Sequence, residues 1–164
     1  MHDARAISNF LLDYAESEGK KLTVMSLLKI IYFAHGWHLA KFGRPLIRNP
    51  FEAWHNGPVV RAVYDCFRDY GSKVIDDRAT KFNPLSESYE PVDYRLNPEQ
   101  ATLLRNVFGA YSQMNAFQLS DMTHQAGSPW DLVWNSSRDT VNLGMRISDD
   151  SIRLDFLRSR SHFQ

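Results

Sequence analysis

The residues best suited to chemistry in this 164-residue chain are one cysteine, Cys66, and six histidines. A thiolate held beside an imidazole is the nucleophile of several classes of enzyme. Cys66, however, flanks the apolar residues of a predicted helix, and free cysteine is among the residue types most often buried. We therefore interpret Cys66 as a structural residue rather than as a nucleophile.

Two further pairs of residues have the spacing of one helical turn. His35 and His38 could present two imidazoles to one metal ion, but the sequence places no further ligand to complete a site. Asp121 and His124 could form a general base, yet nothing beside them marks an activated nucleophile. The chain also lacks a glycine-rich phosphate loop. We therefore predict no catalytic residue, no metal and no cofactor, and interpret the protein as not an enzyme.

The elements that position these residues are predicted to be mainly helical. Apolar residues recur at helical spacing, and caps or glycines mark the ends of most segments. The middle of one segment is apolar nearly all round, with Lys29 as the exception, which is typical of a buried central helix. Helices are predicted over residues 4–17, 23–42, 58–70, 97–113, 117–125, 129–134 and 148–157.

The remaining segments are predicted to be irregular or extended. Residues 51–54 are expected to form a short strand, and Pro58 is expected in the first turn of the third helix. Residues 72–96 show no helical period and are interpreted as a long surface excursion with a strand near Tyr94. The expected fold is a compact, mainly α single domain over residues 1–164, with one or two short β-strands around a buried central helix.

Composition excludes several classes of protein. The chain has 19 basic and 19 acidic residues, so it lacks the basic surplus of most nucleic-acid-binding proteins. No apolar run approaches the length of a membrane span, and no signal sequence is recognisable. A single cysteine excludes an internal disulfide. We expect a cytoplasmic protein that contacts neither membrane nor nucleic acid.

Tryptophan and tyrosine side chains in irregular segments suggest a protein-binding surface. Trp54 stands beside His55, Asn56 and Gly57, and the pair Trp130 and Trp134 follows a Gly-Ser-Pro turn. Such aromatic side chains are enriched at interface hot spots, although tryptophan is also commonly buried in cores. Both interpretations of these residues stay open on the sequence alone.

Several ordered runs of residues resemble a known family. The runs are Leu27–Ala40, Gly43–Leu46, Pro50–Val60, Val63-Tyr64, Tyr70-Gly71, Leu119–His124 and Gly127–Trp130. They resemble the Panacea domain of the SocA-like antitoxin family over nearly the whole chain. One departure is Arg61, which stands where many relatives have proline.

The resemblance implies a non-enzymatic antitoxin that binds a cognate protein toxin and neutralises it, with delivery of the toxin to a cytosolic protease as one route. The runner-up is a phage or prophage interaction module, or a DNA-binding regulator, without a toxin partner. A toxin-binding surface in residues 72–96 remains an alternative to one lined by the motif. The predicted partner-binding residues are Trp54, His55, Asn56, Tyr64, His124 and Trp130. The predicted structural residues are Lys29, Tyr32 and His35 in the interior, with Gly57 and Pro58 at the entrance of the third helix.

Overall fold

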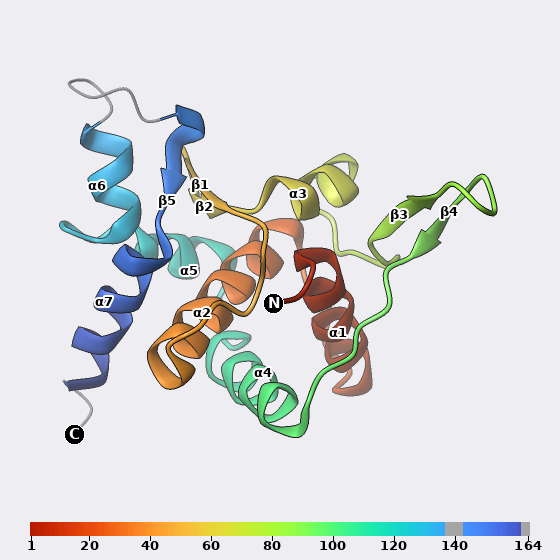
Figure 1. Ribbon diagram of the computed structural model, residues 1–164, viewed down its shortest axis with the longest axis horizontal. Coiled ribbons are helices and arrows are strands. Elements are labelled where there is room, and N and C mark those ends of the chain that lie inside the picture. The colour runs from red at the N-terminus through yellow and green to blue at the C-terminus, as the bar shows by residue number, and fades with distance from the viewer. Residues whose placement is uncertain (137–142, 162–164) are drawn as a thin grey trace.

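The computed structural model describes residues 1–136 and 143–161 and consists mainly of helices (Figure 1). This arrangement confirms the predicted mainly α fold. The α-helices are α1 (Ala4–Ser17), α2 (Val24–Phe42), α3 (Arg61–Phe67), α4 (Pro98–Tyr111), α5 (Ala116–Thr123), α6 (Pro129–Ser136) and α7 (Asp149–Ser161). The strands are β1 (Phe51–Trp54), β2 (Gly57–Val59), β3 (Thr80–Asn83), β4 (Ser88–Pro91) and β5 (Arg146–Ile147), and short 3-10 turns span Arg68–Tyr70 and Leu143–Met145.

Helix α2 is the buried centre of the fold, as its apolar sequence predicts. It packs against α1, α3, α4, α5, α7 and β2 (Figure 1). The Thr23 hydroxyl accepts a hydrogen bond from the Ser26 amide at its start, and Gly43 ends it in the left-handed conformation. Tyr32 and His35 lie in its buried part, at 3% and 1% exposure.

Helix α7 packs against the C-terminal half of α2. The His35 Nε2 atom lies 2.8 Å from Asp149 Oδ1 at the start of α7. The Ile47 amide donates to the other ring nitrogen, Nδ1, so Nε2 carries the proton that Asp149 accepts. Beside this pair, the Phe156 ring meets the Tyr32 ring edge-to-face at 5.9 Å.

A three-stranded antiparallel sheet with the order β2-β1-β5 lies beside α2. Strands β1 and β2 are joined by the turn residues His55 and Asn56, and Trp54 pairs with Gly57. The expectation that Pro58 begins a helix is wrong, because Pro58 lies in β2 opposite Ala53 and α3 starts only at Arg61. Proline has no N–H to donate, and β2 is an edge strand, where that loss is tolerated.

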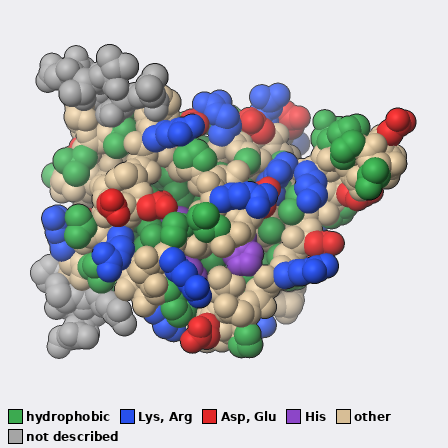
Figure 2. All heavy atoms as spheres, viewed as in Figure 1, with side chains coloured by type: hydrophobic (Ala, Val, Ile, Leu, Met, Phe, Trp, Pro, Cys, Tyr) green, Lys and Arg blue, Asp and Glu red, His purple; other side chains and the backbone are tan. Residues whose placement is uncertain are grey.

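Residues 72–96 contain a β-hairpin that projects from the helical body (Figure 1). The expectation of a strand near Tyr94 is wrong, since the strands are β3 and β4 and Tyr94 follows them in an irregular segment. Its hydroxyl donates instead to Asp13 on α1, at 2.9 Å. Figure 2 shows apolar side chains gathered on the projecting hairpin.

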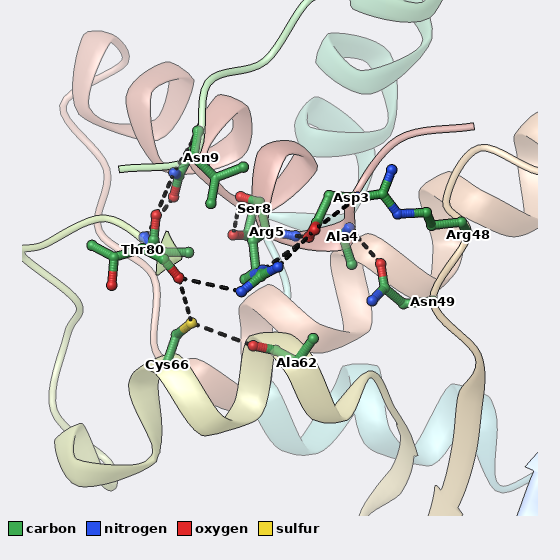
Figure 3. A network of polar contacts seen from close by, with 12 residues as sticks. Asp3, Ala4, Arg5, Ser8, Asn9, Arg48, Asn49, Ala62, Cys66 and Thr80 are labelled. Carbon is green, nitrogen blue, oxygen red and sulfur yellow. Dashed lines mark hydrogen bonds and ion pairs between the residues drawn. The ribbon is translucent and has the colours of Figure 1, made fainter. Parts of the chain in front are cut away.

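The base of this hairpin is fixed to α1 by a network of hydrogen bonds (Figure 3). The side-chain amide of Asn9 donates to the carbonyls of Ala79 and Val92, at 2.9 Å each, and accepts from the Ala79 amide. Arg5, which is paired with the N-cap residue Asp3, also donates to the Thr80 carbonyl. The two ends of the hairpin are therefore held together at one point of α1.

Candidate partner-binding site

We name residues 54–58 the Trp54–Pro58 turn. Every second backbone carbonyl of this turn accepts a hydrogen bond from a side chain, and each of these side chains belongs to a different helix. The Trp130 indole on α6 donates to the Trp54 carbonyl (2.7 Å), the Ser120 hydroxyl on α5 donates to the Asn56 carbonyl (2.8 Å), and Lys29 Nζ on α2 donates to the Pro58 carbonyl (3.0 Å). Side chains from three helices thus fix the conformation of the turn from the interior.

Gly57 allows the turn to lie this close to α2 and α5. Its φ of +108° is a conformation that other residues rarely adopt. A Cβ atom at this position would lie 2.6 Å from the Thr123 hydroxyl and 2.7 Å from Lys29 Cε. The sequence indicated a structural role for Gly57, but at a helix entrance, whereas the structure places it in β2 above Lys29.

Lys29 is the only cation buried completely in the described part of the chain, with 0% exposure. It makes one hydrogen bond, to Pro58, although an ammonium group can donate three. Burial lowers the pKa of Lys29 to about 7, because removal from water disfavours the charged form. A basic group that titrates near neutral pH therefore lies directly beneath the turn.

His124 and Trp130 support the turn from behind. Their rings lie 3.9 Å apart between centroids, and the Trp130 ring also stacks on Trp134 at 5.6 Å. Burial, followed by the nearby charge of Lys29, lowers the pKa of His124. Trp130 is only 7% exposed, so it is placed to hold the turn rather than to offer a surface.

The other four predicted binding residues, Trp54, His55, Asn56 and Tyr64, line one pocket of about 310 Å³ beside the turn. We name it the turn pocket. His55 and Asn56 are exposed at its edge, and the rings of Trp54 and Tyr64 meet edge-to-face at 4.8 Å. The structure thus brings four residues of the predicted set together in one pocket, whereas His124 and Trp130 lie behind the turn and do not line it.

Sequence reasoning did not identify Glu52 and Arg61 as part of this surface. The Trp54 indole donates to Glu52 at 2.8 Å, and the Arg61 guanidinium pairs with the same carboxylate at 2.9 Å while lying over the Trp54 ring. Glu52 and Trp54 are two apart on one strand and share a face, which is a signal available in the sequence. The partner from α3, Arg61, could be found only in the tertiary structure.

The Cys66 thiol and the two histidines of α2 each make separate hydrogen bonds. Cys66 Sγ donates to the Ala62 carbonyl at 3.3 Å and approaches the Thr80 carbonyl (Figure 3), and burial raises the pKa of its thiol. His38 Nδ1 is bonded to the Arg44 carbonyl. Within residues 1–136 and 143–161, no three potential ligands cluster in a way that could hold a metal ion. No helix in the same ranges is both long and apolar enough to cross a membrane.

Comparison with known proteins connects this arrangement to a family. The family model for the antitoxin SocA-like Panacea domain matches residues 27–131, which span α2 through the start of α6 and so include every contact of the Trp54–Pro58 turn described above. Antitoxin SocA of Caulobacter vibrioides is 38% identical over 151 residues, covering 92% of this chain and 80% of that protein. No solved structure gives a significant match. The chain therefore belongs to the SocA-like antitoxin family, which is defined by the Panacea domain.

Proposed function

We propose that the protein neutralises a cognate protein toxin in the cytoplasm by binding it directly, without catalysis, through the Trp54–Pro58 turn and the turn pocket. Membership in the SocA-like antitoxin family supports the role of antitoxin. The observation that carries the choice of surface is the anchoring of three turn carbonyls by Trp130, Ser120 and Lys29.

A turn anchored in this way is suited to recognition. Its conformation is fixed before the partner arrives, so little conformational entropy is lost on binding. The anchored backbone presents the exposed His55 and Asn56 side chains next to Trp54 and Tyr64. Aromatic side chains surrounded by polar groups are typical of the centres of protein interfaces.

The β3–β4 hairpin is the second candidate surface for the same function. Phe82 and Tyr89 form an exposed cross-strand pair at 52% and 73% exposure, and Leu85 near the tip is 96% exposed. Large apolar side chains on a projecting, firmly anchored hairpin (Figures 2 and 3) are also suited to a protein contact.

Growth rescue during co-expression with the toxin encoded beside this chain tests the function and separates the two surfaces. We expect wild type to restore growth and to form a stable complex on a sizing column. The double variant His55→Ala, Asn56→Ala, which alters only exposed side chains, should lose both properties while keeping its circular dichroism spectrum. Leu85→Asp is the matched control on the hairpin and should retain both. The reverse pattern would assign toxin binding to the hairpin, and failure of wild type to rescue would contradict the proposed function.

The same assay in a strain that lacks the cytosolic ATP-dependent proteases separates the two routes of neutralisation. Rescue that persists there, with the toxin still present at full level, indicates neutralisation by blocking. Rescue that disappears, with the toxin stable only in that strain, indicates delivery to a protease.

A further inference from the structure

We propose that the turn pocket takes an acidic side chain of the partner protein together with an apolar side chain next to it in the partner's sequence. This inference rests on the proposed function and specifies which chemistry the toxin must present. Among the residues lining the pocket, Lys29 and Arg68 are basic and none is acidic. A pocket of this composition in a chain of zero net charge favours an anionic group.

Arg68 is the basic residue placed to contact such a group directly. It is exposed in the 3-10 turn that follows α3, and within the described ranges it forms no ion pair. Arg61, seven residues earlier, is already paired with Glu52. Because a guanidinium group binds a carboxylate through two parallel hydrogen bonds, Arg68 can fix both the position and the orientation of an acidic side chain.

Lys29 adds a second positive charge beneath the pocket surface. Its burial alone accounts for the lowered pKa, and no carboxylate contributes to it. Groups near it include the Pro58 carbonyl of β2, to which it donates, the Thr123 hydroxyl beside Gly57, and His124 directly after α5. A partner carboxylate in the pocket would stabilise the protonated form of Lys29, and the attraction is strong because the amine is shielded from water.

The apolar wall of the pocket is formed by the first turns of α2 and by β2. Val24, Leu28 and Val59 are buried there, and Met25 is half-buried beside them. Methionine adapts its shape readily to a neighbouring side chain. With a volume of about 310 Å³, the pocket has room for one or two side chains rather than for a large cofactor. The partner segment is therefore expected to pair one acidic residue with one apolar residue.

Nuclear magnetic resonance titration of the full chain tests the pocket without the toxin. The probe is the peptide acetyl-Ala-Asp-Leu-Ala-amide, compared with the same peptide carrying Asn in place of Asp. We expect the Asp peptide to shift the amide signals of Asn56, Gly57, Arg68 and Gly71 and to bind about tenfold more tightly than the Asn peptide. Its affinity should also fall as the pH rises from 6.5 to 8.5, because Lys29 loses its proton over this range. Equal binding of the two peptides, or no shift with roughly 20 mM Asp peptide, would overturn the inference.

Variants of exposed charged residues give a second test, because they leave the buried Lys29 unchanged. Arg68→Glu should abolish binding of the Asp peptide, Arg68→Lys should retain part of it, and Arg153→Glu on the exposed face of α7 should leave it unchanged. In the growth assay, rescue by wild type but not by Arg68→Glu supports the inference. Equal rescue by wild type and Arg68→Glu would contradict the inference while leaving the proposed function intact, whereas failure of wild type itself would contradict the proposed function.

Discussion

The backbone of Gly57 lies against the side chain of Lys29, and a Cβ atom on this glycine would stand 2.7 Å from Lys29 Cε. The contact joins β2, the edge strand of the three-stranded sheet, to the central helix α2. The Trp54–Pro58 turn therefore packs directly against the buried Lys29 side chain. Any group added to Gly57 must displace Lys29, Thr123 or the turn itself. The absence of a side chain on Gly57 therefore lets the turn lie directly against Lys29 and Thr123.

Replacing Gly57 by Ala is expected to lower the free energy of unfolding by about 2–4 kcal/mol, from the positive φ together with the steric overlap. Urea denaturation followed by circular dichroism measures the change. Gly109→Ala in α4 is the matched control, because no atom lies within 4 Å of its added Cβ, and this change should stabilise the helix by about 0.5–1 kcal/mol. A loss below about 1 kcal/mol for Gly57→Ala would show that the turn can move away from Lys29.

Replacing Gly36 by Ala is expected to weaken the packing of α7 on α2. The added Cβ would lie 2.3 Å from the ring of Phe156, and overpacking of this kind costs about 1–3 kcal/mol. Thermal unfolding of Gly36→Ala, Phe156→Leu and the double variant measures the coupling. We expect the double variant to be more stable than the sum of the single effects predicts, whereas strictly additive losses would contradict a direct contact.

The stability of the protein is expected to depend on the ionisation of Lys29. Because burial lowers its pKa from 10.5 to about 7, the folded chain binds fewer protons than the unfolded chain between these values. The penalty for burying the charge is therefore fully present below pH 7 and decreases as the pH rises. Relative to Lys29→Met, wild type should gain about 2 kcal/mol of unfolding free energy between pH 7 and 9.

Urea denaturation of both chains at several pH values measures this difference, in which groups common to the two chains cancel. Lys73→Met, at an exposed position, is the control and should show no dependence on pH relative to wild type. A constant difference between wild type and Lys29→Met over this range would mean that Lys29 does not titrate near neutrality.

Replacing Trp130 by Phe is expected to weaken toxin binding by loosening the turn. The variant keeps an aromatic ring against His124 but loses the indole donor to the Trp54 carbonyl, at a cost of about 1–3 kcal/mol of stability. Trp37→Phe is the matched control, because it also removes an indole donor, the one that bonds to the Tyr111 hydroxyl of α4. The role of the turn would be supported if both variants lost a similar amount of stability but only Trp130→Phe lost growth rescue. Equal rescue by both variants would contradict it.

Local signals in the sequence were sufficient for much of the fold. The central position of α2 follows from its apolar surface, and the start of α4 follows from Asn97 and Gln100, which form a reciprocal cap. The prediction that Pro58 begins a helix was wrong, because proline fits both a first helical turn and an edge strand. Only the pairing with β1 decides between them. Strand β5 has two residues, too few to show any pattern.

The sequence by itself determined the class of fold and which residue types surround the candidate site. Trp54, His55 and Asn56 are neighbours in the chain, so their grouping needed no tertiary information. The tertiary structure alone decided that Lys29, Ser120 and Trp130 bind successive alternate carbonyls of one turn, and that Arg68 joins the same pocket while Trp130 lies behind it. Periodicity reports which face of an element is apolar, whereas contacts across 29 to 76 residues depend on how separate elements pack around α2.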